Sequence, residues 1–255
     1  MSRQADLFEK FAALHTPGDP LVLYNAWDAG SAAVIEAAGA PAVATGSWSV
    51  AGAQGYDDGQ ALPLDHVLMV AANIVRRVSV PVSLDFESGY ATAPDDLVRT
   101  TMSVLETGIV GVNFEDQDIA AGRLFATDRQ VERIGALREA AQAAGQPLWI
   151  NARTDVFLNA PPEEHATHVD EAIGRVRAYA AAGGNSVFVP GLTDPNLVQK
   201  VCAASEAPVN VMASGGGPTR DDIAALGVAR ISYGPGPFRD AMARLESAAQ
   251  AIYAD

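Results

Sequence analysis

Acidic side chains stand at the ends of several short apolar runs in this sequence. Asp85 and Glu87 follow one run and Glu115 and Asp116 close the next. Asp155 follows a later run, and Asp57 and Asp58 lie after an earlier one. Carboxylates that are brought together repel one another and take up protons unless a cation neutralises them. A set of oxygen ligands suits a hard cation such as Mg²⁺, with Mn²⁺ as a substitute. These carboxylates taken together therefore favour a metal site, and a solvated acidic rim paired with Arg or Lys is the alternative.

Arg153 follows directly on another apolar run, within the segment INARTD at 150–155. A guanidinium at such a position can clamp a carboxylate or a phosphoryl group through two parallel hydrogen bonds. A structural ion pair with Asp155 or Glu115 is the alternative. Arg153 is therefore a candidate for binding the anionic end of a substrate.

Two glycine-containing segments could also bind an anion. The segment ATGSWS at 44–49 runs into Gly46 and Ser47, whose backbone N–H groups can form an anion-binding nest, although a tight turn would explain the same glycine. The segment SGGGPT at 214–219 resembles the phosphate-binding loop of many barrels, in which a helix N-terminus faces the anion. A flexible loop is the alternative for this second segment.

Eight apolar runs, each followed by an amphipathic stretch, must position these residues. The runs are nearly continuous in Val, Ile and Leu, which is typical of parallel strands buried on both faces. Eight strand–helix units spaced on the order of 30 residues apart predict an α/β fold, the (β/α)8 barrel of TIM type. The predicted strands are residues 20–26, 41–46, 80–86, 109–115, 147–152, 185–190, 208–212 and 229–234.

A doubly wound open sheet uses the same units and is the rival architecture. It normally carries G-x-G-x-x-G after its first strand, and YNAWDAGSA at 24–32 lacks that pattern. No Pro/Gly/Ser-rich linker divides the chain, so residues 1–255 are expected to form one barrel domain. Residues 3–14 are predicted to form an extra N-terminal helix, and residues 237–253 a final one. In such a barrel the active site lies at the C-terminal ends of the strands, where the acidic residues stand.

The composition limits the classes of partner. The chain has 255 residues, of which 49% are hydrophobic and 19% charged, enough for a sizeable core. The formal net charge of −14 disfavours nucleic acid and anionic membrane surfaces as partners. The N-terminus lacks a signal-peptide pattern, no window is apolar enough to cross a membrane, and the single cysteine excludes an internal disulfide. We therefore expect a soluble cytoplasmic protein.

Segments from most of the chain resemble the isocitrate lyase/phosphoenolpyruvate mutase superfamily. They occur in the expected order at the expected strand ends, which makes the combination specific although each segment alone is weak. The resemblance implies a barrel enzyme of the lyase type that uses Mg²⁺. The segments are YNAWDAGSA at 24–32, GSWS at 46–49, GYDDGQ at 55–60, LDFESGY at 84–90, GVNFEDQ at 111–117, INARTDVFL at 150–158, FVPGL at 188–192, PVNVM at 208–212 and ARISYGPG at 229–236.

The resemblance also assigns roles to individual residues. It implies that Asp85 binds the metal directly and that Glu87, Glu115 and Asp58 bind it partly through water. It implies that Arg153 and the segment after the second strand bind the anionic end of the substrate, next to the loop after the first strand. The substrate-binding residues that follow from it are Trp27, Asp28, Gly46, Ser47, Trp48 and Arg153.

Neither well-characterised catalytic loop of the superfamily is present. Lyases for isocitrate or methylisocitrate carry K-K/R-C-G-H after strand four, with a catalytic cysteine, and the mutase and the phosphonopyruvate hydrolase carry a G-K-N/T-S-like loop there. The segment here, DQDIAAGRLFATDR at 116–129, has no cysteine or histidine and only Arg123 as a basic residue at its centre. The chain therefore resembles the subgroup near the oxaloacetate decarboxylase-like and oxaloacetate hydrolase-like enzymes, and isocitrate and methylisocitrate are expected to be poor substrates.

The leading hypothesis is a Mg²⁺-dependent enzyme that breaks a bond at carbon three of a small, anionic, oxaloacetate-like 2-oxo acid through a metal-stabilised enolate. The alternatives are phosphorus–carbon bond chemistry on phosphonopyruvate, as hydrolase or mutase, and a non-catalytic barrel that binds a 2-oxo acid. A sugar-phosphate isomerase or aldolase that uses the loop at 215–217 is disfavoured, because no lysine stands at a strand end. A water or a loop side chain such as Arg123 can complete proton transfer. The candidate catalytic residues are Asp58, Glu115, Arg153 and Arg123.

The final predicted helix carries an apolar stripe at three- and four-residue spacing. This stripe either covers the barrel of its own chain or packs on another subunit, and periodicity alone does not distinguish the two. The resemblance favours a homotetramer in which this helix is exchanged between subunits. The stripe consists of Met242, Leu245, Ala248, Ala249 and Ile252.

Overall fold

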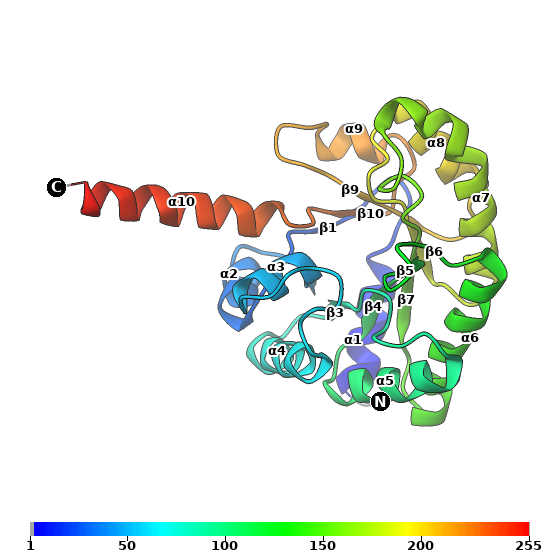
Figure 1. The fold of residues 1–255 in the computed structure, drawn as a ribbon, viewed down its shortest axis with the longest axis horizontal. Helices are drawn as coiled ribbons and strands as arrows, with labels where there is room; N and C mark the ends of the chain where they lie inside the picture. Colours follow the sequence, from blue (N-terminus) through cyan, green and yellow to red (C-terminus); the bar gives the residue numbers. More distant parts are fainter. Residues whose placement is uncertain (1–2, 255) are drawn as a thin grey trace.

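Eight parallel strands form a nearly closed barrel in the computed structural model, which describes residues 3–254 (Figure 1). Neighbouring strands follow the order β1, β10, β9, β8, β7, β4, β3 and β2. A parallel bridge between Ala26 and Thr45 joins the segments after β1 and β2. The predicted TIM-type barrel is thus confirmed. The strands are β1 (Leu21–Leu23), β2 (Val43–Ala44), β3 (Val82–Asp85), β4 (Gly111–Glu115), β7 (Trp149–Arg153), β8 (Ser186–Phe188), β9 (Val209–Met212) and β10 (Arg230–Ser232).

Helices follow the strands and cover the outside of the barrel. Local chemistry explains several of their ends: Asp194 accepts hydrogen bonds from the first turn of α8, Pro94 opens α5, and Gly145 in the left-handed conformation ends α6. The helices are α1 (Arg3–Ala13), α2 (Ala29–Ala37), α3 (Ser47–Ala53), α4 (Leu64–Arg77), α5 (Pro94–Glu106), α6 (Thr127–Ala144), α7 (His165–Ala181), α8 (Pro195–Ala204), α9 (Arg220–Ala224) and α10 (Gly236–Tyr253).

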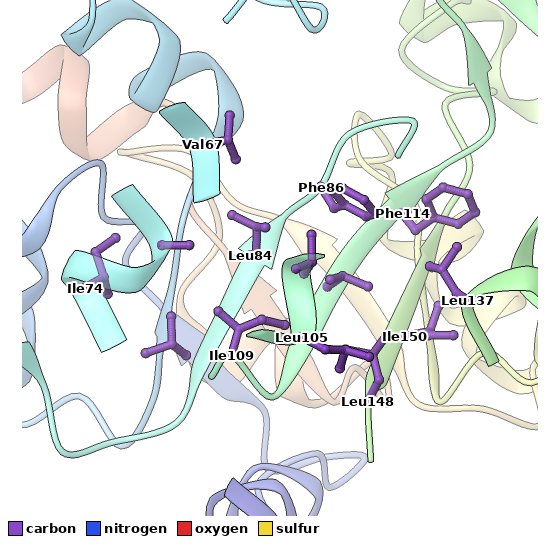
Figure 2. Packing of buried hydrophobic residues seen from close by; sticks show 14 of the residues in the cluster. Val67, Ile74, Leu84, Phe86, Leu105, Ile109, Phe114, Leu137, Leu148 and Ile150 are labelled. Atoms are coloured by element: carbon purple, nitrogen blue, oxygen red, sulfur yellow. The ribbon is translucent and has the colours of Figure 1, made fainter. Parts of the chain in front are cut away.

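Apolar side chains fill the layer between the strands and the helices. Figure 2 shows part of this layer, in which Leu84 and Phe86 lie near Phe114, Leu105 and Ile150. These side chains are buried, and each contributes about 1.5–3 kcal/mol when it is removed from water. The packing therefore holds the ends of β3 and β4, which carry the acidic residues, in fixed positions.

Helix α1 covers the end of the barrel opposite the acidic residues. Phe11 packs edge-on against Trp149 at the start of β7, and His15 stacks on the same indole with ring centroids 4.3 Å apart. Inside the barrel, the fully buried Arg230 donates a hydrogen bond to Asn113. The barrel is therefore filled by side chains rather than open as a channel.

Helix α10 projects away from the barrel (Figure 1). Only its first turn is buried, through Pro237 and Phe238, whereas Leu245 and Ile252 are 61% and 73% exposed. The apolar stripe of this helix therefore does not cover the barrel of its own chain. No helix in the described part of the chain is long and apolar enough to cross a bilayer.

Two short features were not predicted from the sequence. The segment after β2 forms helix α3, and the segment after β4 forms a hairpin of β5 (Gln117–Asp118) and β6 (Arg123–Leu124). Elements of two to seven residues carry too few positions for a helical or strand period to show. Both features lie at the mouth of the barrel and bear on the site.

Candidate active site

Asp85 lies at the C-terminal end of β3, at the mouth of the barrel. Its backbone N–H donates to the Thr45 hydroxyl, and its Oδ2 accepts a hydrogen bond of 2.9 Å from the backbone N–H of Ser47. Its Oδ1 is buried and has no hydrogen-bond partner among the described residues. A buried carboxylate oxygen without a partner is costly, so Oδ1 is a ready ligand for a cation.

Glu87 is buried two residues further on, and two residues hold its carboxylate. The Tyr90 hydroxyl donates to Oε1 over 2.6 Å and the backbone N–H of Gln60 donates to Oε2 over 2.7 Å. Burial raises the pKa of Glu87 to about 7; the Tyr90 hydrogen bond opposes this shift, and the nearby Asp85 adds to it. Glu87 therefore changes its charge near neutral pH.

The turn that carries Glu87 has an unusual backbone. Glu87, Tyr90 and Gln60 all have positive φ, at 49°, 56° and 62°, which is uncommon for residues other than glycine. Gly89, which lies between Glu87 and Tyr90, has φ +81°. A Cβ there would lie 2.4 Å from a side-chain atom of Leu97, so only glycine fits. The free-energy cost of these unfavourable φ angles is thus concentrated around one acidic side chain, as is common at functional sites.

Glu115 and Arg153 are direct neighbours, because β4 and β7 pair in parallel with these two residues in register. Arg153 Nη1 lies 2.9 Å from Glu115 Oε2. Arg153 also binds Asp155 through two hydrogen bonds, from Nε to Oδ1 and from Nη2 to Oδ2. The ion pairs considered as the alternative role of Arg153 are therefore both present. Each terminal nitrogen still carries a second N–H.

Burial and charge act in opposite directions on this pair. Burial raises the pKa of Glu115 well above its usual value, and the carboxylates of Asp155 and Asp85 add to the shift while Arg153 opposes it. For Arg153, burial opposes the charged form, but Glu115 and Asp155 outweigh it and keep the pKa raised. Arg153 is therefore cationic, and it does not neutralise the whole acidic group.

Asp116 supports this arrangement from behind. It is fully buried, accepts hydrogen bonds from the backbone N–H of Asp155 and from the Tyr179 hydroxyl, and pairs with Arg175 over 3.1 Å. These contacts fix the loop after β7. They therefore hold Asp155 where it can orient the Arg153 guanidinium.

A cavity of about 190 Å³ lies over the mouth of the barrel. Asp85, Asp58 and Arg153 line it together with Ser47 and Trp48. Its volume is below the range of pockets for drug-sized ligands, so it suits a small molecule. The geometry thus joins two expected metal ligands and four expected substrate-binding residues, Gly46 among them, around one small cavity.

Asp58 lies at the rim of this cavity. Partial burial and the charge of Asp85 raise its pKa, whereas the Gly59 backbone and the Ser47 hydroxyl act in the opposite direction. Glu87 and Asp85 both line a smaller neighbouring cavity. Glu115 does not line the larger cavity itself, but it forms an ion pair with Arg153, which does. The four predicted metal-binding residues therefore occupy one end of the barrel.

The donor set fits Mg²⁺ with one restriction. In the part of the chain that the structure describes, no three His, Cys, Asp or Glu side chains converge as a preformed set of metal ligands. Oδ1 of Asp85 nevertheless has no hydrogen-bond partner among the described residues, and the acidic residues near it offer only oxygen ligands. Mg²⁺ usually keeps several waters and binds one or two carboxylates directly. A cation held by Asp85, with the other carboxylates behind water, agrees with both observations.

Gly46 and Ser47 do not form the expected nest. Gly46 is the N-cap of α3 with φ −126°, and its N–H donates to Ala26, while the Ser47 N–H donates to Asp85. Both backbone donors are thus used inside the protein, and the anion that Ser47 binds is a carboxylate of the chain. The unpredicted helix α3 is the reason, because its N-terminus points at the end of β3. Trp48 lines the cavity with its side chain.

Trp27, Asp28 and Arg123 do not line this cavity. Asp28 caps helix α2 by accepting a hydrogen bond of 2.7 Å from the backbone N–H of Ser31, and Trp27 packs edge-on against Phe238. Arg123 is exposed on the β5–β6 hairpin. Trp27 and Asp28 therefore lie outside this cavity, because the loop after β1 packs against α10.

The alternative phosphate loop is occupied by an acidic side chain. Asp222 accepts hydrogen bonds from the backbone N–H and the hydroxyl of Thr219 at the start of the short helix α9. An aspartate at this position takes the donors that an anion would need. This observation disfavours the sugar-phosphate hypothesis.

Several residues at the site were missed in the sequence. Asn25, Asn113 and Ser232 line the cavity, and Tyr90 and Gln60 hold Glu87. Tyr90 and Gln60 belong to the segments LDFESGY and GYDDGQ, so they were visible without an assigned role. The three polar cavity residues stand inside or just after apolar runs, and polar residues in such positions were the available signal.

A parallel (β/α)8 barrel with carboxylates and one arginine around a small cavity at its mouth defines a class of enzymes. The family described as phosphoenolpyruvate phosphomutase matches residues 11–253. The chain belongs to this family and is an enzyme of the isocitrate lyase/phosphoenolpyruvate mutase superfamily, whose members are lyases and mutases.

Three similar proteins illustrate the relationship. A crystal structure from Burkholderia cenocepacia J2315, provisionally described as a phosphonomutase, is 44% identical with a TM-score of 0.94 and covers 99% of this chain and 100% of that chain. The 2-methylisocitrate lyase of Escherichia coli K12 is 29% identical over 95% of this chain and 82% of its own length. The oxaloacetate decarboxylase of Ectopseudomonas mendocina ymp is 30% identical over 71% of this chain and 61% of its own length.

Proposed function

We propose that the protein is a Mg²⁺-dependent lyase that cleaves a carbon–carbon bond at carbon three of a small 2-oxo acid. The observation that carries this proposal is that Asp85, whose Oδ1 has no hydrogen-bond partner among the described residues, lines a small cavity together with Arg153. A bound Mg²⁺ would supply Lewis-acid stabilisation of the negative charge that develops on the substrate oxygens. Asp85, with Asp58, Glu87 and Glu115 through water, would hold it.

Arg153 binds the carboxylate of the substrate in this proposal. Its bonds to Glu115 and Asp155 fix the guanidinium plane at the cavity wall. The second N–H of each terminal nitrogen is available to a substrate carboxylate. Because the guanidinium is already oriented, little side-chain freedom is lost when the substrate binds.

Asp58 and Glu115 are the groups that can move a proton. The pKa of each is raised, so each can hold a proton closer to neutral pH than an ordinary carboxyl group. Asp58 lines the cavity itself, which places it closer to a substrate than Glu115. Arg123 could take part only after the β5–β6 hairpin closes over the cavity.

Phosphorus–carbon bond chemistry remains the second candidate function. The family match and the likeness to the Burkholderia protein favour it. Arg153 could bind a phosphonate as readily as a carboxylate. A non-catalytic binding barrel would use the same contacts without turnover.

A screen for pyruvate release tests these functions together. Purified protein with Mg²⁺ is assayed against 2-oxo acids that carry a cleavable group at carbon three, including oxaloacetate and phosphonopyruvate. Release of pyruvate from oxaloacetate above the metal-only background supports carbon–carbon cleavage, and release from phosphonopyruvate alone supports the second function. Binding without any turnover supports the binding barrel.

Isocitrate and methylisocitrate serve as the critical negative substrates. The chain has neither Cys nor His between Glu115 and Arg153, and its single cysteine, Cys202, lies in α8 outside the cavity. Cleavage of either compound at about 1 per second or faster, with oxaloacetate left at background, contradicts the proposed function.

A further inference from the structure

The cavity at the mouth of the barrel has two chemically different sides. Asp85, Asp58 and Arg153 carry all its charge. The rest of the lining is uncharged. Asn25, Ser47, Asn113 and Ser232 are its polar side chains, and its apolar part comes mainly from the ends of β8 and β9 and from the loops after β7, β8 and β10. Its apolar residues are Trp48, Leu158, Phe188, Pro190, Met212 and Pro235.

Arg153 is the only cationic side chain among the described residues that line this cavity. Two other arginines come near without entering it. Arg239 lies over the Trp48 ring at 4.5 Å, and Arg230 is fully buried below, with Asn113 as its hydrogen-bond partner. A substrate with a second anionic group would therefore place that group against uncharged side chains, most of them apolar, where a charge without a cationic partner is costly.

Phe188 places the apolar wall next to Arg153. The Arg153 guanidinium lies 5.9 Å from the centre of the Phe188 ring, so the apolar wall begins beside the anion-binding group. If the carboxylate of a 2-oxo acid binds Arg153 and its carbon chain runs along this wall, the chain lies against Phe188, Pro190 and Met212. The end of the substrate beyond carbon three then lies against the apolar wall.

We propose that the substrate is a 4-hydroxy-2-oxo acid with one carboxylate and a neutral, apolar substituent on carbon four. This inference rests on the proposed function and names its substrate class. The apolar wall takes the substituent, and Arg153 takes the only carboxylate. The fragment that leaves is an uncharged aldehyde or ketone.

The corresponding cleavage balances without a further reactant. Asp58 takes the proton of the carbon-four hydroxyl, the carbon–oxygen bond becomes a carbonyl, and the bond between carbons three and four breaks. Its electron pair stays with carbon three as an enolate. A proton then adds to carbon three, which gives pyruvate or its 3-substituted analogue and regenerates the carboxylate.

The binding of non-cleavable 2-oxo acids to the intact protein with Mg²⁺ tests the proposed substrate class without turnover. Calorimetry compares pyruvate, 2-oxobutanoate and 2-oxopentanoate, and then 2-oxoglutarate with 5-methyl-2-oxohexanoate, in which an isopropyl group replaces the distal carboxylate. Each added methylene is expected to tighten binding about fourfold, which corresponds to about 0.8 kcal/mol per buried methylene. The branched acid is expected to bind at least about tenfold more tightly than 2-oxoglutarate. Equal or tighter binding of 2-oxoglutarate overturns the inference.

A substitution in the apolar wall of the cavity provides a second test of the substrate class. Leu158 is 45% exposed, so Leu158→Arg can be accommodated, and it adds the missing cation. This variant is expected to reverse the preference between the two matched acids. Met69→Arg changes a residue that is 52% exposed on α4 outside the cavity, and it is expected to leave the preference unchanged. An unchanged preference in Leu158→Arg overturns the inference.

The outcomes separate the inference from the proposed function. If the dicarboxylate binds best and Arg123→Ala removes that preference, the hairpin supplies a second cation: the inference fails and the proposed function stands. If none of the 2-oxo acids binds in the presence of Mg²⁺, both fail. Release of pyruvate from 4-hydroxy-2-oxohexanoate, with the apolar preference in binding, supports both.

Discussion

At the scale of single residues, Asp85 and Arg153 differ in how fully their polar atoms are paired. Asp85 has an oxygen without a partner, whereas all three nitrogens of Arg153 contact carboxylates. A new ligand at Asp85 therefore satisfies an oxygen that has no partner, while a new ligand at Arg153 takes the second N–H of a nitrogen that already binds a carboxylate. This difference predicts that metal binding precedes and strengthens substrate binding.

Asp85→Asn is expected to weaken Mg²⁺ binding by at least about tenfold, or about 1.4 kcal/mol, because the amide removes the charge from the unpartnered oxygen. The metal-free variant is expected to be at least as heat-stable as the wild type, because repulsion among the carboxylates is relieved. Calorimetric titration and thermal unfolding without metal measure the two effects. Unchanged Mg²⁺ affinity would show that the metal site is wrong, and lower metal-free stability would indicate a structural role.

Arg153→Lys retains the charge but loses the planar fork. Binding of a 2-oxo acid such as pyruvate, or of its analogue oxalate, is expected to weaken by about 2 kcal/mol, the scale of a lost charged hydrogen bond. Arg129→Lys is the matched control, because Arg129 forms an exposed pair with Glu132 on α6. Wild-type affinity in Arg153→Lys, measured by calorimetry on folded protein, contradicts the assignment.

At the scale of elements, the turn after β3 and the loop at 55–60 act as one unit. Gln60 and Tyr90 both donate to Glu87, and the pKa of Glu87 is about 7. The pKa of Glu87 is 4.5 in the unfolded chain and about 7 in the folded one, so the metal-free fold loses stability as the pH rises from about 4.5 to about 7, where Glu87 becomes charged. Metal binding has the opposite dependence, because it requires the charged form.

Tyr90→Phe tests this unit. The substitution removes the hydrogen bond that lowers the pKa of Glu87, so the midpoint of the pH dependence of Mg²⁺ affinity is expected to move upward from about 7. Tyr56→Phe, on the exposed part of the neighbouring loop, is expected to leave the midpoint in place. Mg²⁺ titrations across the pH range provide the measurement, and a midpoint that does not move shows that Glu87 does not control metal binding.

The turn after helix α1 contains a second group that makes the stability depend on pH, at the other end of the barrel. Burial, together with the charge of Arg230, lowers the pKa of His15 from 6.5 to about 3. Below pH 6.5 the unfolded chain binds a proton that the folded chain does not, so stability falls with decreasing pH toward about 3, by at most about 1.4 kcal/mol per pH unit. His15→Phe is expected to remove this part of the pH dependence. Denaturant unfolding of both proteins at several pH values measures the difference, and parallel curves would contradict the assignment.

The helices and strands also show which parts of the fold could be predicted from the sequence. All eight barrel strands were predictable, because a buried parallel strand is an uninterrupted apolar run. The register that brings Glu115 beside Arg153 was not, because it depends on which strands pair. Helix α3 was too short to detect, and its N-terminus explains why the Ser47 N–H binds Asp85.

The candidate site was predictable to a similar extent. The positions of Asp85, Glu87, Glu115 and Asp58 at one mouth follow from the barrel alone. The roles of Trp27 and Asp28 did not follow, because the direction of a loop is decided by what it packs against. Here α2 and α10 decide it.

At the scale of the whole molecule, α10 carries an apolar face that a single chain leaves exposed. Beyond Phe238 its apolar residues remain exposed, including Leu245 and Ile252. Leu245→Asp with Ile252→Asp is expected to convert an oligomer, which the resemblance implies to be a tetramer, into monomers. Ser247→Asp on the same helix is the control. Light scattering that shows a wild-type monomer at micromolar concentration removes both the oligomer and the exchange of this helix.

The positive φ angles at Gln60, Glu87 and Tyr90 have a consequence for the history and engineering of this protein. Each such angle costs of order 1 kcal/mol or more, and the hydrogen bonds at the acidic turn keep it in place. Substitutions at these positions therefore act on heat resistance and on metal binding at once. A library selected only for heat resistance is expected to accumulate changes here and to lose metal binding, whereas selection for turnover preserves the three residues.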